Sequence, residues 1–418
     1  MQTQTIRIPI KAWYGDEEME LQFPETWEVH ECRMAGHDAP PLSEEQLREA
    51  LRHPVGTEPL REMARGKKQV VILFDDLTRP APTWKILPYV LEELQEAGIT
   101  DDQIRFIGAF ANHAAMCLED FVKKLGKDVV RRFRIYNHNP YEHLVDLGKT
   151  TRGTPVLINR EVMECDLKIG IGGLIPHLGA GFGGGAKLVV PGVAGIVSAD
   201  HNHRVIGSMG GDRSVEKKFR LGKIEDNEVR QDIEEAVRKV GLDLKIDLLV
   251  NNRREIVGVF AGDFIAQHRA GVEKAKQLYA TQVVKDCDIV VTNAFPIENQ
   301  VIKGVWPARL SLKAGGTAVV VVQSVEGQAL HYLAGRFGTN YGGNMWGKPQ
   351  QLLVPQAGRL LVCSSYLSRT DLDMYGPAEK VIPCSTWAEV LIHLLQDHPQ
   401  QAKVAVYPYA AIQYPAAD

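Results

Sequence analysis

Short, unbroken apolar segments constrain the fold of this chain more than any other feature. Val70 to Phe74, Ile104 to Gly108 and Leu167 to Gly172 each have the length of a strand. A continuously apolar strand is typical of a sheet that is buried on both faces. Segments with helical periodicity, about 10–15 residues long, separate strands of this kind. The alternation predicts an α/β fold with mostly parallel sheets.

The chain is long enough for two such domains. Its 418 residues exceed what one hydrophobic core comfortably supports. After a long predicted helix at 264–280, the alternation resumes with predicted strands at 289–292 and 317–323. We therefore predict two α/β domains, residues 1–265 and 266–418, with the last residues able to pack back on the first domain. We expect the active site in the cleft between the two domains.

Composition excludes several classes of protein. Hydrophobic residues make up 44% and charged residues 24%, as in ordinary globular proteins. A net charge of −4 without a basic face argues against nucleic acid as a partner. No apolar run approaches the ~20 residues of a membrane span, and no secretory signal is recognisable at the N-terminus. Six cysteines without C-x-x-C spacing indicate reduced thiols, so we expect a cytoplasmic enzyme.

A glycine-rich segment follows the strand at Leu167 to Gly172. Five of the seven residues from Gly179 to Gly185 are glycine. Because each glycine loses much backbone entropy on ordering, the run suggests backbone held close to a bulky ligand, such as a phosphate bound by N–H groups. Lys187 closes the run, His177 precedes that lysine by ten residues, and His203 follows it by sixteen. The combination predicts a cofactor or metal site.

Polar residues also follow the two earlier strands. The segment Asp75 to Arg79 comes directly after the first, and His113 comes after the second. The carboxyl ends of parallel strands are where open α/β sheets bind ligands. Acidic residues there can hold ribose hydroxyls, and arginine suits a carboxylate or phosphate; the alternative is a surface turn whose charges pair with each other. His138 and His143 flank a predicted turn, and we expect both to be surface residues.

A comparable loop follows a predicted strand in the C-terminal half. Gln300 and Lys303 lie three residues apart, so at the start of a helix they would share a face. A lysine and an amide at a helix N-terminus suit a substrate carboxylate.

Taken together, these motifs resemble the lactate racemase family, whose members use a nickel-pincer nucleotide. The resemblance covers most of the chain. It rests on the order and spacing of the segments Asp75 to Pro80, His113, His177 with Lys187, His203, and Gln300 to Lys303.

The resemblance implies a racemase or epimerase of a 2-hydroxy acid that works by reversible hydride transfer to nickel pyridinium-3,5-bisthiocarboxylic acid mononucleotide. His113 and His177 would be the acid–base pair, and His203 would be a nickel ligand. Lys187 would carry the cofactor covalently, or at least contact it. The remaining implied residues are Asp75, Asp76, Thr78, Gly183, Gly184 and Gly185 for the cofactor, and Arg79, Gln300 and Lys303 for the substrate. Enzymes that assemble the cofactor would be required partners.

The chemistry makes independent sense of this set. Removing a proton from C2 of a 2-hydroxy acid is difficult, because that C–H is very weakly acidic. Moving a hydride instead requires an electron acceptor and a base for the hydroxyl, and the two enantiomers present that hydroxyl to different sides. Two histidines fit because their unperturbed pKa is close to neutral. Imidazole is also a common ligand for nickel.

Several alternatives remain open. The chain could be a non-racemising redox enzyme with the same cofactor, or a protein that binds nickel or the cofactor without turnover. His201 could replace His203 as the ligand. Ala114 stands where the family commonly has arginine, which concerns the identity of the substrate more than the type of reaction. Trp346 and Tyr366 could line the pocket or be simply structural.

Overall fold

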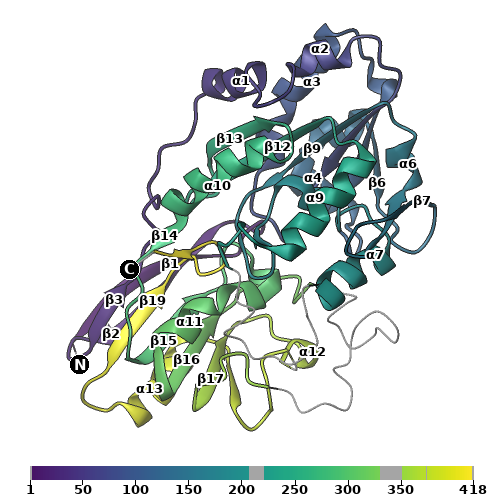
Figure 1. The fold of residues 1–418 in the computed structure, drawn as a ribbon. Coiled ribbons are helices and arrows are strands. Elements are labelled where there is room, and N and C mark those ends of the chain that lie inside the picture. Colours follow the sequence, from purple (N-terminus) through teal and green to yellow (C-terminus); the bar gives the residue numbers. More distant parts are fainter. Residues whose placement is uncertain (1, 207–220, 330–350, 373, 417–418) are drawn as a thin grey trace. The chain divides into compact units, whose positions relative to one another are not determined.

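The structure is a computed structural model that describes residues 2–206, 221–329, 351–372 and 374–416. Packing divides the chain into two compact units (Figure 1). Unit 1 contains residues up to 37, residues 277–329 and the C-terminal segment, and unit 2 contains residues from 38 to 276. Each unit is built on one six-stranded sheet. No described helix is long and apolar enough to cross a membrane.

The sheet of unit 2 is parallel except at one edge, where β13 runs antiparallel to β12. This arrangement confirms the predicted mostly parallel sheet. In spatial order its strands are β13 (Ile256–Gly262), β12 (Leu244–Val250), β9 (Leu167–Gly173), β4 (Val70–Phe74), β5 (Ile104–Gly108) and β6 (Arg134–Asn137).

The chain builds this sheet outward from β4. It first adds β5 and β6 on one side, and then β9 and β12 on the other. This reversal places a topological switch point between β4 and β9, which is where open α/β sheets leave a crevice for ligands. Phe74 lies level with Gly108 and with Ile171. The loops that follow β4, β5 and β9 therefore begin at the same edge.

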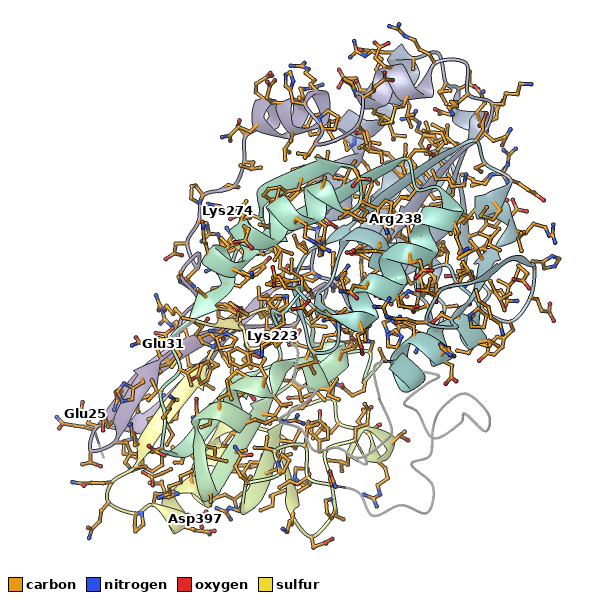
Figure 2. The ribbon with its side chains drawn as sticks, viewed as in Figure 1. Glu25, Glu31, Lys223, Arg238, Lys274 and Asp397 are labelled. Carbon is orange, nitrogen blue, oxygen red and sulfur yellow. The ribbon has the colours of Figure 1, made fainter. Side chains whose placement is uncertain are left out.

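Alternation along β4 explains why all of its residues are buried. Val71 and Leu73 belong to a hydrophobic cluster on one face, together with Ile233 of the amphipathic helix α9. On the other face, Phe74 packs edge-on against Phe121 of α4. Figure 1 shows α9 crossing one face of the sheet, while its residue Arg238 is exposed, as is Lys274 on α10 (Figure 2).

The helices of unit 2 include α1 (Glu44–Arg52), α2 (Leu60–Ala64), η1 (Thr83–Lys85), α3 (Leu87–Glu96), η2 (Asp101–Gln103), α4 (Leu118–Leu125), α5 (Lys127–Arg132), α6 (Arg160–Met163), η3 (Gly185–Leu188), α7 (Ile196–Asp200), η4 (His201–Ile206), α9 (Glu228–Val240) and the start of α10 (Ala266–Tyr279).

The sheet of unit 1 is parallel throughout. Its strands, in spatial order, are β18 (Val381–Cys384), β17 (Arg359–Cys363), β16 (Leu312–Val321), β15 (Cys287–Asn293), β19 (Lys403–Tyr407) and β3 (Glu28–Glu31). The N-terminal residues form an antiparallel pair, β1 (Thr3–Ile10) and β2 (Glu17–Pro24). The remaining elements of this unit include η5 (Glu298–Gly304), α11 (Trp306–Ser311), α12 (Arg369–Leu372), α13 (Trp387–Asp397), β14 (Ala280–Thr281) and β20 (Tyr414–Pro415).

The two units differ from the predicted domains in their boundaries. The first 37 residues belong with the C-terminal half, and the change of unit after residue 276 replaces the predicted change after residue 265. The reason lies in long-range packing: β3 pairs with β19, and Trp387 of α13 donates its indole N–H to the carbonyl of Gln22. The same indole packs edge-on against Phe23. The predicted inter-domain active-site cleft remains a prediction.

The strand near residue 156, β8 (Pro155–Asn159), is not part of the parallel sheet; it pairs antiparallel with β7 (Leu144–Lys149). An isolated bridge joins Ile158 to Ala194, which draws β8 toward the segment after the glycine run. Most of the predicted helix at 328–337, and Trp346, lie outside the described residues.

His138 is buried, so the prediction that it lies on the surface was wrong. Its Nε2 donates to the carbonyl of Ala194 at 2.9 Å, and its Nδ1 accepts from the amide of Asn159 at 3.0 Å. Burial lowers the pKa of His138 from 6.5 to about 4, and the bond to the Ala194 carbonyl opposes that shift. His143 is exposed, as predicted.

We expect His138 to make unfolding depend on pH. The unfolded chain binds a proton at this histidine below pH 6.5, whereas the folded chain binds it only below about pH 4. The unfolding free energy should therefore fall by ~3 kcal/mol between these pH values on account of this residue. His138→Asn should flatten the pH dependence in urea denaturation, and the matched variant His143→Asn should not. Equal slopes for wild type and His138→Asn would contradict the account.

Candidate active site at the carboxyl edge of the unit 2 sheet

A buried carboxylate joins the loop after β4 to the end of β9. Asp75 Oδ2 accepts the backbone N–H of Gly173 at 2.6 Å, and Asp75 Oδ1 lies 2.5 Å from Nζ of Lys124. The Lys124 side chain is completely buried. It also donates to the carbonyls of Arg79 and Ala81, both at 3.0 Å. These bonds fix the loop that carries the predicted site residues.

Sequence reasoning missed Lys124, although a signal for it existed. Lys124 shares the buried face of the amphipathic helix α4 with Phe121 and Leu125. Burial lowers the pKa of its ammonium group, while the neighbouring Asp75 carboxylate opposes that shift. A lysine on the apolar face of a helix needs such a partner. In this structure Asp75 therefore holds the loop together, and its predicted cofactor contact remains a prediction.

Asp76 and His113 form a hydrogen-bonded pair that links the loops after β4 and β5. His113 Nδ1 lies 2.6 Å from Asp76 Oδ2. The other oxygen, Oδ1, accepts the backbone N–H of Thr78 at 3.0 Å and the Thr78 hydroxyl. Burial by itself raises the pKa of Asp76, but His113, Arg79 and Thr78 outweigh that effect and hold it well below its usual range. Asp76 thus stays ionised and orients the imidazole.

The chain reaches His113 through a strained turn. Ala111 has a φ of 58°, in the left-handed region that residues other than glycine seldom adopt. Its N–H bonds to the carbonyl of Gly192 at 2.8 Å, and the N–H of His113 bonds to the carbonyl of Phe110 at 3.0 Å. Strained backbone of this kind is common at functional sites.

His177 lies on the short strand β10 (Pro176–His177), which pairs with β11 (Gly181–Phe182). This hairpin follows β9, so it begins at the same edge of the sheet as the loop of His113. The imidazole is half-buried. Its Nδ1 accepts two backbone N–H groups, those of Gly179 and Ala180, both at 3.1 Å.

The glycine run is explained by close packing within the protein. Gly181, Gly184 and Gly185 all have positive φ, at 75°, 67° and 55°. A Cβ on Gly181 would lie 2.2 Å from the carbonyl oxygen of Lys223, and one on Gly184 would lie 2.6 Å from the carboxylate of Asp247. Such approaches exclude any side chain. Protein atoms alone therefore require glycine at these positions, and the predicted contact of this backbone with a ligand remains a prediction.

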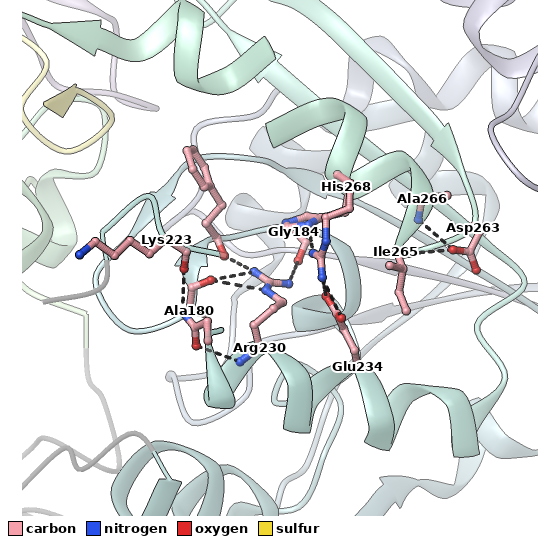
Figure 3. Close-up of polar contacts among 12 residues, drawn as sticks. Ala180, Gly184, Lys223, Arg230, Glu234, Asp263, Ile265, Ala266 and His268 are labelled. Atoms are coloured by element: carbon pink, nitrogen blue, oxygen red, sulfur yellow. Dashed lines mark hydrogen bonds and ion pairs between the residues drawn. The ribbon is translucent and has the colours of Figure 1, made fainter. Parts of the chain in front are cut away.

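Arg230 of α9 binds the backbone of the glycine-rich segment (Figure 3). Its side chain is completely buried, which lowers the pKa of the guanidinium to about 10, with Glu234 opposing the shift. The guanidinium donates to four backbone carbonyls, those of Ala180, Phe182, Gly183 and Gly184. His268 also donates through Nε2 to the carbonyl of Gly183, at 2.9 Å. Sequence reasoning missed Arg230, because it read α9 only as an amphipathic helix.

Two of the three glycine N–H groups predicted to hold phosphate are bonded within the protein. The N–H of Gly183 bonds to the carbonyl of Ile175 at 2.7 Å. The N–H of Gly185 bonds to Asp247 Oδ2 at 2.8 Å. Phosphate binding by this backbone, including Gly184, remains a prediction.

Lys187 follows the run in η3 and is buried, with 9% of its surface exposed. Burial holds the pKa of its amine well below the ordinary value, and the positive groups of Arg230 and Arg79 lower it further. A lysine in such surroundings is neutral for a larger share of the time and is then nucleophilic.

His203 lies in the π-helical turn η4 and is also buried. Its Nδ1 lies 3.0 Å from the carbonyl of Ala199, which fixes the proton on Nδ1 and leaves the lone pair on Nε2. Burial, together with the nearby Lys187 and His113, lowers the pKa of His203 to about 3. The charges of Lys187 and His113 thus reach His203, and His203 stays neutral.

A buried polar network anchors the turn that carries His203. Asp232 of α9 accepts the hydroxyls of Thr150 at 2.6 Å and Thr154 at 2.7 Å, and the amide of Asn202 at 2.8 Å. His201 Nδ1 in turn bonds to the Thr154 hydroxyl at 2.8 Å. His201 is therefore engaged with this network. Single π-helical turns inside helices occur frequently at functional sites.

The two predicted substrate residues of the C-terminal half, Gln300 and Lys303, belong to unit 1. They lie in η5, a 3-10 segment broken at Gln300, whose φ of −135° and ψ of 67° are not helical. Gln300 is buried and Lys303 half-buried. The expected regular helix start is therefore absent at this point. All other predicted site residues belong to unit 2.

The donor set available for a metal is small. Across residues 2–206, 221–329, 351–372 and 374–416, no three histidine, cysteine, aspartate or glutamate side chains gather in a way that could hold a metal ion.

Comparisons with known proteins agree with the resemblance seen in the motifs. A family model described as the lactate racemase N-terminal domain matches residues 14–214. A lactate racemase from Lactiplantibacillus plantarum is 32% identical over 296 residues, covering 68% of each chain. The chain belongs to the lactate racemase family. It is therefore an enzyme, an isomerase of the racemase type. A second relative in the family, a lactate racemase from Thermoanaerobacterium thermosaccharolyticum, is 29% identical over 296 residues, covering 68% of this chain and 67% of that one.

Solved structures share the fold of this lactate racemase family member. The lactate racemase apoprotein from Thermoanaerobacterium thermosaccharolyticum superposes with a TM-score of 0.74 at 21% identity, covering 99% of this chain and 100% of that one. A protein from Thermotoga maritima gives a TM-score of 0.67 at 18% identity, covering 90% and 98%. At such identities the likeness concerns the fold alone.

We expect Lys124→Met to destabilise the enzyme strongly. The substitution leaves the Asp75 carboxylate buried without its counter-ion, which typically costs about 3–5 kcal/mol. The loss should appear in urea denaturation followed by circular dichroism. Lys127→Met, at an exposed position on the next helix, should change the unfolding free energy by no more than ~0.5 kcal/mol. Equal effects of both variants would show that the Asp75–Lys124 pair does not hold the loop.

Proposed function

We propose that this enzyme interconverts the two configurations at C2 of a 2-hydroxy acid by reversible hydride transfer, with a nickel-pincer nucleotide as cofactor. The observation that carries the proposal is the grouping of an oriented base, His113 on Asp76, with a buried neutral imidazole, His203, and a buried amine, Lys187. The names of the two relatives suggest lactate as one candidate substrate.

His113 would take the proton of the substrate hydroxyl. With Nδ1 bonded to an ionised carboxylate, Nε2 carries the lone pair, and Asp76 stabilises the imidazolium that forms. The same arrangement lets the imidazolium return the proton. His177, on the loop after the neighbouring strand β9, would serve the other enantiomer.

Arg79 would bind the substrate carboxylate. Its guanidinium donates to the carbonyl and the hydroxyl of Thr78, at 2.9 and 2.7 Å, so its position is set by the loop that also holds Asp76. A planar guanidinium suits a carboxylate because it can donate two parallel hydrogen bonds. We propose Gln300 and Lys303 as further carboxylate ligands. Fixing the carboxylate orients C2 and its hydroxyl toward the base.

The residues present fit the proposed cofactor. His203 offers Nε2 in the neutral form that a late first-row metal prefers. His203 would be the ligand that the protein itself supplies to the nickel. When bound, the cofactor would supply the acceptor for the hydride of C2. His203 is a better candidate than His201, whose Nδ1 is engaged with Thr154.

Lys187 would form the covalent attachment. Burial favours the neutral form of its amine, which is the nucleophilic form that a covalent link to the cofactor would require. Lys187 follows closely in sequence on the carbonyls that Arg230 binds. The backbone at Lys187 is therefore held in place. Asp75, Asp76, Thr78 and the backbone of Gly183, Gly184 and Gly185 remain proposed cofactor contacts. We propose a cytoplasmic location, where enzymes that assemble the cofactor would be its partners.

The test is intact-mass and metal analysis of protein produced together with the enzymes that assemble the cofactor. We expect stoichiometric nickel and an adduct that peptide mapping places on Lys187. His203→Ala should lose nickel, and His143→Ala should retain it. Loaded His113→Gln should racemise at least ~100-fold more slowly, because general acid–base catalysis typically contributes that much.

Other outcomes would contradict the proposal. Nickel retained in His203→Ala would remove that ligand, and an unmodified Lys187 in loaded protein would exclude covalent attachment. Consumption of an external oxidant or reductant would indicate a redox enzyme. Full biological activity of His113→Gln would indicate a binding protein without turnover.

A further inference from the structure

We propose that the two acid–base histidines are not equivalent, because their surroundings fix opposite tautomers. His113 presents an unprotonated Nε2, and Asp76 is the positioning residue that sets this state. His177 presents an Nε2–H. The inference rests on the proposed function for its catalytic meaning, but the tautomers can be measured without it.

The tautomer of His113 follows from its partner, Asp76. Asp76 is 6% exposed, accepts the N–H and the hydroxyl of Thr78 on one oxygen, and faces His113 Nδ1 at 2.6 Å with the other. An ionised carboxylate can only accept hydrogen bonds. Nδ1 of His113 therefore carries the proton, and in the neutral ring the lone pair lies on Nε2.

The neighbours of His177 fix the opposite tautomer. The partners of its Nδ1 are the backbone N–H groups of Gly179 and Ala180, both at 3.1 Å, and a backbone N–H can only donate. Nδ1 of His177 therefore carries the lone pair, and in the neutral ring the proton lies on Nε2. The tight hairpin of β10 and β11 brings these two N–H groups to the same ring nitrogen.

This difference has a catalytic consequence. The hydroxyl proton of one enantiomer can pass directly to Nε2 of His113: the O–H bond breaks, an N–H bond forms, and the electron pair stays on oxygen. His177 cannot accept a proton at Nε2 while its Nδ1 holds the lone pair. Before it acts as a base, its ring must exchange tautomer and give up both bonds to the hairpin. By microscopic reversibility both directions pass through this exchange. It precedes proton transfer in the direction in which His177 is the base, and it follows proton transfer in the other direction.

Thermodynamics limits which kinetic constants can show this asymmetry. Two enantiomers have equal free energy, so kcat/KM must be the same in both directions for any variant. The asymmetry can appear only in kcat and KM taken separately, with a lower kcat and a lower KM in the direction that is slowed by the rearrangement.

The test of the tautomers is nitrogen-15 NMR of histidine-labelled protein at about pH 8, where free imidazole is neutral. His113→Gln and His177→Gln assign the two signals by their loss. We expect the unprotonated nitrogen to be Nε2 in His113 and Nδ1 in His177. The same tautomer in both rings, or averaged signals in both, would overturn the proposal. Because the protein need not carry cofactor, this result stands apart from the proposed function.

Asp76→Asn tests the positioning role. An asparagine amide can donate to Nδ1, so His113 should change to the tautomer with an unprotonated Nδ1 while His177 keeps its own. In the serine-protease triad, the equivalent change lowers kcat by about 10⁴ because the base has the wrong tautomer, and we expect a loss of at least ~100-fold here. Nickel content and the Lys187 adduct should fall by much less than turnover, because Asp76 is only one of several proposed cofactor contacts. Asp101→Asn, which removes a surface partner of Arg132, is the matched control and should retain wild-type turnover.

The outcomes separate the two proposals. Unchanged turnover, or an unchanged His113 tautomer, in loaded Asp76→Asn would overturn the positioning role. A loss of nickel as large as the loss of turnover, with the His113 tautomer unchanged, would assign the effect of Asp76 to the cofactor alone and also overturn it. If wild-type protein took up no cofactor, the proposed function would fail while the NMR result still decided the tautomers.

Discussion

The structure of the site depends on one buried carboxylate. Asp75 bonds to the N–H of Gly173 across the switch point between β4 and β9, and to the ammonium group of Lys124 from the helix below. This bridge extends the pairing of β4 with β9 into the loop after β4. That loop also carries Asp76, which orients His113, and Arg79. The bridge therefore helps to fix the positions of these residues relative to β9.

A second feature that organises the site is the buried, positively charged guanidinium of Arg230. Arg230 binds the carbonyls of the glycine run, and burial lowers the pKa values of both Lys187 and His203 and so favours their neutral forms. Water-exposed versions of these groups would be charged or solvated, and neither would suit an amine that must act as a nucleophile or an imidazole that must bind a metal. The fold thus provides the chemistry of these two side chains mainly through desolvation.

The sequence allowed the elements near the site to be predicted because their signals are local. The apolar strands β4, β5 and β9 and the amphipathic helix α9 depend on residues within each element. The unit boundary, the burial of His138 and the roles of Lys124 and Asp232 depend on partners 21 or more residues away, such as Trp387 for Gln22 or Ala194 for His138. No local pattern contains that information. The glycine run illustrates the same limit, because its neighbours Lys223 and Asp247 are remote in sequence.

The central claim is that three imidazoles far apart in the chain, His113, His177 and His203, serve a single cofactor site in this member of the lactate racemase family. The most direct measurement is a crystal structure of protein loaded with cofactor and a 2-hydroxy acid. The account predicts nickel bonded to His203 Nε2, with His113 and His177 on either side of the substrate C2. A metal held elsewhere, or imidazoles that face separate regions of the molecule, would contradict it.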